Sequence, residues 1–253
     1  SIPPVDIVKE PEKGKPDPLS WRFRLGRKGQ AQGWDMYGRR QGEFASGAMG
    51  FDLYPVYYNG LVYVNDSSRV YALAVTGGKI KWREPDRETG RINGLPLGCY
   101  VSDGKLFAVL RNTNPLVTRT SSRNRRAMQA LNELYCFDAG RIRKNPPLWH
   151  TAGMREATEL GETSFTSVPL VDGSRVFVAG VEITEQQQNY NLSCFTTSGE
   201  FLWNNTFCAT KWGNIYRRAP LTAATLTVSR GKAIVCTNVG VVAAVNAFNG
   251  ELE

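Results

Sequence analysis

The feature that most constrains the fold is a pattern that recurs in four copies along the chain. Each copy begins with a proline, passes through a glycine turn into an alternating apolar segment, and continues into a second segment that contains a small residue. A second glycine turn follows. In the first and third copies a tryptophan stands four residues after that glycine, as in Gly78 to Trp82 and Gly199 to Trp203. Self-similarity at this spacing is typical of proteins built from repeated supersecondary units.

Short strands joined by tight turns explain the pattern. Asn59-Gly60 and Asp103-Gly104 are dipeptides that favour the positive φ angles of a two-residue hairpin turn. The segments after these turns, Leu61 to Val64 and Lys105 to Val109, are rich in the β-branched and aromatic residues that strands prefer. The copies therefore predict an all-β fold, a β-propeller of four-stranded antiparallel blades.

The predicted propeller occupies residues 19–253 and follows an extended Pro- and Lys-rich linker or tail over residues 1–18. Its blades are expected near residues 50–90, 91–155, 160–210 and 215–253. The fourth copy reaches Gly250, and the residue after Glu253 is where the pattern places its tryptophan. Unless residues 19–50 complete that blade, the roughly four blades are expected to be part of a larger ring of about seven or eight.

The tryptophan and the small residue of each copy have clear physical roles. The tryptophan can pack its ring against the next blade while its indole N–H finds an acceptor near the surface. The small position is filled by Ala72, Cys136, Cys194 and Ala244. Because thiol cysteine behaves as a small hydrophobe, we interpret Cys136 and Cys194 as packing residues. Three cysteines stay unassigned, Cys99, Cys208 and Cys236, with a Cys194–Cys208 hairpin disulfide as one alternative.

Two of the blade endings are nearly regular. They read Tyr71-Ala72-Leu73 followed by Gly78-Lys79-Ile80-Lys81-Trp82, and Leu192-Ser193-Cys194-Phe195 followed by Gly199-Glu200-Phe201-Leu202-Trp203. These endings resemble the repeat of the pyrroloquinoline quinone (PQQ)-like β-propellers, and the resemblance covers about residues 50–253. It implies the propeller fold.

The same resemblance implies two classes of function. The PQQ-like family contains quinone-dependent alcohol and sugar dehydrogenases. It also contains cofactor-free members, among them the propeller lipoprotein of the outer-membrane β-barrel assembly machinery and other exported bacterial propellers. The dehydrogenases carry an adjacent Cys-Cys pair against the quinone, and this sequence has no such pair. The chain is therefore expected to resemble the cofactor-free branch, with no catalytic, cofactor-binding or metal-binding residues.

The composition restricts the chemistry further. The chain has one histidine, His150, so a site built from several imidazoles is excluded. None of its five cysteines forms a Cys-x-x-Cys pair. A mechanism of the Ser-His-Asp or Cys-His kind would have to pass through His150 alone. No stretch approaches the roughly 18 continuous apolar residues that a membrane-spanning helix needs.

Two segments that the repeat does not explain are candidates for binding a partner. Both are rich in arginine or aromatic residues, which favour interfaces when they are exposed. The candidate residues are Arg119, Arg123, Arg125, Arg126, Trp212, Tyr216, Arg217 and Arg218. The net charge of +8 permits an anionic polymer at the basic insertion, with a solvated surface as the alternative. Residues 127–133, which follow that insertion, suit a short helix. A propeller lacks a groove-reading element, so no specific nucleic acid is expected.

Together these features predict a non-enzymatic, exported β-propeller that acts as a protein-interaction or scaffold module in the cell envelope. The chain begins Ser1-Ile2-Pro3-Pro4, which we interpret as a processed product of a periplasmic or extracellular protein. One alternative is a fragment of a PQQ-dependent dehydrogenase. Another is a carbohydrate-binding propeller, suggested by the aromatic content of 11%.

Overall fold

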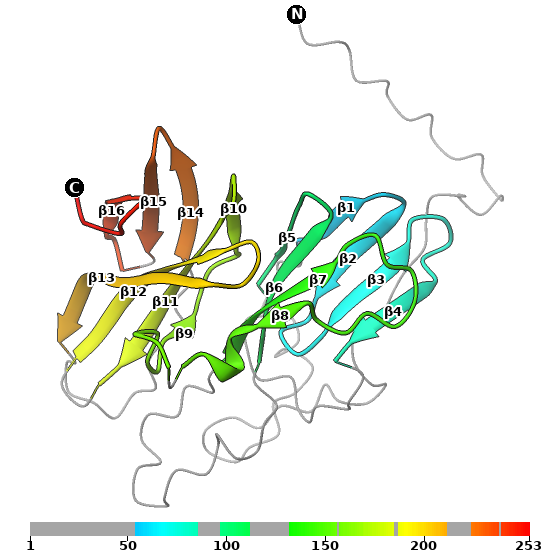
Figure 1. The fold of residues 1–253 in the computed structure, drawn as a ribbon, viewed down its shortest axis with the longest axis horizontal. Coiled ribbons are helices and arrows are strands. Elements are labelled where there is room, and N and C mark those ends of the chain that lie inside the picture. Colours follow the sequence, from blue (N-terminus) through cyan, green and yellow to red (C-terminus); the bar gives the residue numbers. More distant parts are fainter. Residues whose placement is uncertain are drawn as a thin grey trace, which may run out of the picture.

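The computed structural model describes residues 54–85, 97–111, 132–155, 157–184, 187–211, 224–237 and 239–253. These residues form four separate antiparallel sheets, which we call blades 1 to 4 (Figure 1). The predicted all-β class and the propeller-like arrangement of blades are confirmed. The blades are not closed into a ring by the described residues.

The bounds of the strands follow the repeat. Blade 1 contains β1 (Val56–Tyr58), β2 (Leu61–Asn65), β3 (Val70–Ala74) and β4 (Ile80–Glu84). Blade 2 contains β5 (Cys99–Ser102), β6 (Lys105–Arg111), β7 (Asn132–Asp138) and β8 (Trp149–His150). Blade 3 contains β10 (Leu170–Asp172), β11 (Arg175–Ile183), β12 (Gln187–Thr196) and β13 (Phe201–Lys211), and β9 (Ser164–Phe165) pairs with β11. Blade 4 contains β14 (Ala224–Ser229), β15 (Lys232–Thr237) and β16 (Val242–Asn246). A short 3₁₀ helix, η1 (Thr151–Gly153), follows β8.

The turns between the first two strands of a blade have the predicted conformation. Asn59 and Gly60 have φ angles of 46° and 80°, and Asp103 and Gly104 have φ angles of 48° and 73°. Two successive residues at positive φ give the backbone twist that matches a two-residue hairpin. Pro55 immediately precedes β1, where its missing N–H removes no ladder hydrogen bond.

Pairing within the sheets shows that the copies are equivalent residue by residue. The small residue of each copy lies opposite a large one, in the pairs Tyr63–Ala72, Phe107–Cys136, Phe177–Cys194 and Ile234–Ala244. On its other side the small residue lies opposite the tryptophan, as in Ala72–Trp82, Cys136–Trp149 and Cys194–Trp203. The predicted packing role of Cys136 and Cys194 is therefore confirmed, and both side chains are fully buried.

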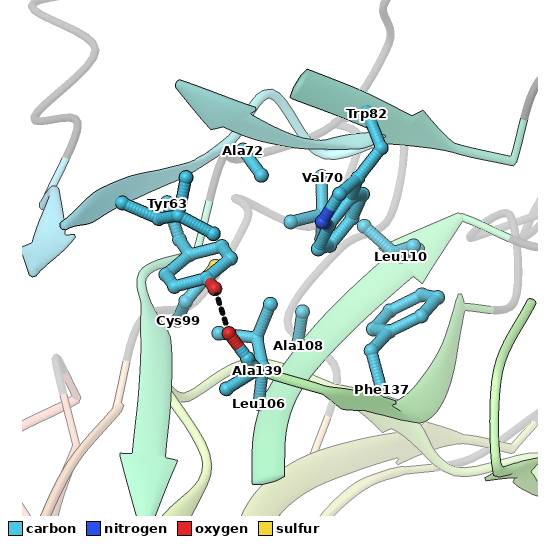
Figure 2. Packing of buried hydrophobic residues seen from close by; sticks show 11 residues of the cluster. Tyr63, Val70, Ala72, Trp82, Cys99, Leu106, Ala108, Leu110, Phe137 and Ala139 are labelled. Atoms are coloured by element: carbon cyan, nitrogen blue, oxygen red, sulfur yellow. Dashed lines mark hydrogen bonds between the residues drawn. The ribbon is translucent and has the colours of Figure 1, made fainter. Parts of the chain in front are cut away.

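The hydrophobic core is divided among the blade boundaries. Between blades 1 and 2, Tyr63, Ala72 and Trp82 face residues such as Leu106, Ala108 and Phe137, as Figure 2 shows. The Tyr63 hydroxyl donates a hydrogen bond to the Ala139 carbonyl across this boundary. Equivalent clusters join blade 2 to blade 3 and blade 3 to blade 4. Each blade is thus held mainly by its neighbour, as expected for sheets that each present an apolar face.

Blade 4 ends the described array. Its outer face carries Ile234 and Ala244, which are half-buried, whereas their equivalents in blades 1 to 3 are fully buried. Within the described residues blade 4 contains three strands, and an isolated bridge joins Val245 to Leu252. Residues 1–18 and 19–50 lie outside the described residues.

Two sequence predictions are wrong. Asn132 and Glu133, expected at the end of a short helix, belong to strand β7, because they pair with Arg111 and Leu110 of β6. The Cys194–Cys208 disulfide, which was one alternative, does not form, since Cys208 lies opposite Tyr190 while Cys194 lies opposite Trp203. All five cysteines are free thiols.

Candidate partner-binding face

The strand order gives the array two different faces. Because successive strands are antiparallel, the connections from first to second and from third to fourth strand leave each blade at one end. We call this end the turn face. The connections from second to third strand, and those from one blade to the next, leave at the opposite end. We call that end the insertion face.

Most connections of the turn face are short, hydrogen-bonded turns. In blades 1, 3 and 4 the turn that follows the third strand is closed by a backbone hydrogen bond of 2.8 Å. The N–H groups of Ala74, Thr196 and Asn246 donate to the carbonyls of Lys79, Glu200 and Glu251, respectively. The corresponding connection of blade 2 is longer and runs over residues 139–148.

Both segments predicted to bind a partner fall in connections whose flanking strand ends lie at the insertion face. Residues 119–126 lie between β6 and β7, and residues 212–218 lie between β13 and β14. The eight candidate residues, Arg119, Arg123, Arg125, Arg126, Trp212, Tyr216, Arg217 and Arg218, are outside the described residues. The strand ends that flank them are described, and both connections start and finish at this face.

The neighbouring residues Phe165 and Thr166 contact the first residues of β7 and β14, the strands that follow the two connections. Asn132, at the start of β7, donates from Nδ2 to the Phe165 carbonyl at 2.7 Å and accepts from the Phe165 N–H at 2.7 Å. Ala224, at the start of β14, donates its N–H to the carbonyl of Thr166 at 3.1 Å. Adjacent residues of one segment therefore hold the ends of both candidate connections.

A buried ion pair fixes that segment. Glu133 has a fully buried side chain and accepts from Arg155 Nε at 3.0 Å and from the Thr151 hydroxyl at 2.6 Å. Arg155 also donates to the carbonyls of Asn132, Gly161 and Thr163, at 2.7, 2.9 and 2.8 Å. Its guanidinium lies over the Phe165 ring, 5.8 Å from the centroid. The guanidinium of Arg155 therefore fixes the chain between β8 and β9 through its ion pair with Glu133 and its hydrogen bonds to backbone carbonyls.

Sequence reasoning missed this ion pair. One signal was present, because Glu133 follows Asn132 and precedes the apolar alternation of Leu134 to Phe137. An acidic residue at a buried strand position requires a cationic or hydrogen-bonding partner. Nothing in the sequence identifies that partner as Arg155.

Three cysteines and the single histidine of the described residues have clear structural environments. Burial raises the pKa of the Cys99, Cys136 and Cys194 thiols to about 12, so these cysteines are protonated at neutral pH. His150 accepts a hydrogen bond at Nδ1 from the Ala152 N–H, at 3.3 Å, and caps η1. Within the ranges that the structure describes, His, Cys, Asp and Glu side chains do not gather in groups of three or more that could hold a metal ion. No helix of the described chain is long and apolar enough to cross a bilayer.

Comparisons with known proteins find structural likeness only. No protein-family model matches the chain, and a comparison with curated proteins finds no match. Among solved structures, the chain is similar to BamB from Moraxella catarrhalis, with 15% identity and a TM-score of 0.46, over 78% of this chain and 49% of BamB. A europium-containing methanol dehydrogenase matches with 9% identity and a TM-score of 0.48, over 79% of this chain and 40% of the enzyme.

A third solved structure is the β-propeller domain of Nup133 from Vanderwaltozyma polyspora. It matches with 10% identity and a TM-score of 0.43, over 81% of this chain and 63% of that domain. The chain spans about half of the length of BamB and less than two thirds of each of the other two.

Proposed function

We propose that this chain is a non-enzymatic β-propeller segment of an exported protein, and that it binds a protein partner in the cell envelope through its insertion face. The observation that carries the proposal is the shared anchorage of the two candidate connections. Asn132 and Ala224 are bound to the neighbouring residues Phe165 and Thr166, so both connections re-enter the array at one place. A propeller presents its functional residues in such loops while the blades serve as a rigid support.

The chemistry of the two connections supports a protein partner. One supplies four arginines and the other a tryptophan, a tyrosine and two arginines. These residue types dominate the binding energy of protein interfaces. The resemblance of the blade endings to the cofactor-free PQQ-like propellers supports the same reading and an exported, periplasmic or extracellular location.

Site-specific photo-cross-linking in the native cell tests the proposal. A photoreactive amino acid at Arg123 or Tyr216 is expected to yield the same protein adduct, because the two connections are joined at their ends. The matched controls are Ser198 and Lys144, exposed residues of the turn face, and they are expected to yield none. Adducts from the turn face alone would contradict the proposal, and an adduct digested by glycosidases would replace the protein partner with an anionic polysaccharide.

A second assay addresses the enzymatic alternative. The purified protein is incubated with PQQ, calcium and a mixture of alcohols and sugars, and the reduction of an electron-acceptor dye is followed. We expect no bound chromophore and no dye reduction above the rate without protein. Turnover that depends on the added quinone would overturn the non-enzymatic assignment while leaving the fold unaffected.

A further inference from the structure

Two connections of the turn face lie next to each other in blades 1 and 2. One joins β3 to β4, and the other joins β7 to β8 (Figure 1). Trp82 of β4 donates from Nε1 to the Arg141 carbonyl of the second connection, at 2.6 Å. An open hollow of about 280 Å³ is lined by residues of β4 and by Lys144. Side chains of the two blades therefore share one surface at this place.

The two stretches that form this surface carry positive charge. Residues 75–83 and 139–148 contain six lysines and arginines and neither aspartate nor glutamate, and we call them the basic patch. All six cations are exposed, namely Lys79, Lys81, Arg83, Arg141, Arg143 and Lys144. Arg83 has a partner, whereas the side chains of the other five make neither an ion pair nor a hydrogen bond among the residues that the structure describes. Glu84, which also lines the hollow, is buried.

The turn after the third strand does not require this charge. Its closing hydrogen bond has its acceptor at Lys79 in blade 1, and at Glu200 and Glu251 in blades 3 and 4. The same turn thus forms with a cation or an anion at that position. The positive charge of Lys79 therefore has no role in the turn itself.

Exposed aliphatic side chains lie between the cations of the basic patch. Ile142 is 60% exposed and lies between two arginines, and Ile80 is 37% exposed and lies between two lysines. Val75 and Leu148 are exposed as well. The one aromatic residue of the patch, Trp82, is buried. The surface thus presents cations and single aliphatic side chains.

This combination matches the surface of an anionic bilayer. Each lysine or arginine near anionic headgroups strengthens binding by about fivefold. Aliphatic side chains add to this attraction when they enter the boundary between headgroups and acyl chains. A protein partner fits less well, because the cores of protein interfaces are depleted in lysine and enriched in aromatic residues.

We infer that the basic patch is a membrane-binding surface, which holds the turn face of blades 1 and 2 against a bilayer of anionic phospholipids. Its lysines and arginines bind headgroup phosphates, and Ile142 and Leu148 enter the boundary with the acyl chains. The insertion face lies at the opposite end of the strands and stays accessible to a protein. The inference goes beyond the proposed function and does not depend on it. Because the ligand is a lipid, Lys144 is still expected to yield no protein adduct.

Vesicle flotation with the purified protein tests this inference. One set of vesicles contains phosphatidylcholine alone, and the other contains one third phosphatidylglycerol. We expect the protein to float with the anionic vesicles only, and to be released at about 1 M salt, where the Debye length falls to about 3 Å. No binding to either set, or equal binding to both, would overturn the inference. Neither result affects partner binding at the insertion face, because no protein partner is present.

Two pairs of charge variants distinguish the patch from the net charge of the chain. Lys79→Glu with Arg143→Glu is expected to lower binding to the anionic vesicles at least about tenfold. Lys211→Glu with Arg230→Glu removes the same charge at exposed positions outside the patch and is expected to lower it by less than about threefold. The denaturation midpoint of each variant verifies that it is folded. Equal losses from the two pairs would overturn the inference.

An apolar pair tests the entry of aliphatic side chains without a change of charge. Ile142→Ser with Leu148→Ser is expected to lower vesicle binding about tenfold, because the buried apolar area is lost. The matched control, Val242→Ser with Leu252→Ser, replaces exposed aliphatic residues of blade 4 and of the segment after it, and is expected to have no effect. Unchanged binding of the first pair would contradict the contact of these side chains with the bilayer.

Discussion

At the scale of single residues, the tryptophans connect the blades through two separate interactions. Trp203 is 9% exposed, and its ring packs against Phe177 with the centroids 6.0 Å apart. Its indole N–H crosses to the next blade and reaches the Phe248 carbonyl. The ring supplies buried apolar area, and the N–H determines which part of the next blade it meets.

Substitutions at Trp203 separate these two contributions. Trp203→Phe retains an aromatic ring but removes the donor, and we expect it to lower the free energy of unfolding by about 1–2 kcal/mol. Trp203→Ala removes the ring as well and is expected to cost about 3–5 kcal/mol. Urea denaturation measures both values. Equal losses from the two variants would show that the packing of the ring contributes nothing beyond the hydrogen bond.

The buried thiols predict a dependence of stability on alkaline pH. Burial raises the pKa of Cys136 and Cys194 from 9.0 to about 12, so the folded chain binds protons more tightly than the unfolded chain. Their contribution is fully present below about pH 9 and is lost as the pH rises toward 12. Burial likewise raises the pKa of Tyr63 to about 12, which adds to the effect from pH 10 upward.

The measurement is the free energy of unfolding across this pH range. We expect a steady fall above about pH 9 for the native sequence, and a shallower fall for the double variant Cys136→Ala, Cys194→Ala, because alanine does not titrate. Alanine suits both positions, since Ala72 and Ala244 fill them in blades 1 and 4. Parallel pH profiles for the two proteins would show that the thiols are not the titrating groups.

At the scale of elements, the ion pair between Glu133 and Arg155 positions the chain from η1 to β9. Arg155→Ala removes the guanidinium that is bound to a fully buried carboxylate, and loss of one partner of a buried ion pair typically costs about 3–5 kcal/mol of unfolding free energy. Arg143→Ala, at an exposed position of the turn face, is the matched control and is expected to leave the denaturation midpoint unchanged. A midpoint for Arg155→Ala that equals the control would contradict the structural role of this pair.

The strands and turns were largely predictable from the sequence because local signals fix them. Asn59-Gly60 and Asp103-Gly104 adopt the hairpin turn that their types favour, and the small residue lies between the large residue and the tryptophan in three blades. The predicted helix over 127–133 was wrong at its end, since pairing of Glu133 with Leu110 decides the conformation there. Strand pairing of this kind overrides helix propensity, which is a weak local preference.

The candidate face was predictable only in part. Its arginine-rich and aromatic segments are visible in the sequence, and the order of the strands places both connections at one end of the blades. The contacts that join their ends were not predictable, because Asn132 and Phe165 are 33 positions apart and no repeat residue marks them. Contacts between distant, non-repeated residues leave no periodic signal.

At the scale of the whole molecule, the proposed function separates the residues that stabilise the fold from those that bind the partner. The apolar clusters between blades hold the array, and the insertion face carries the variable connections. Replacing residues 119–126 by a Gly-Ser segment of equal length is therefore expected to leave the denaturation midpoint unchanged, because loop composition without a change of length alters closure entropy little. The same variant is expected to abolish the cross-link from Tyr216. A large loss of stability would show that the basic insertion belongs to the core.

Hydrogen exchange of the protein with and without its cross-linked partner tests whether the partner binds the insertion face. We expect slower exchange at the described edges of the insertion face, over residues 132–134, 163–167 and 224–226. The turns over residues 74–79, 139–148 and 196–200 are expected to exchange at the same rate in both states. Slower exchange of those turns in the complex, or unchanged exchange at the insertion face, would contradict the proposal that the partner binds the insertion face.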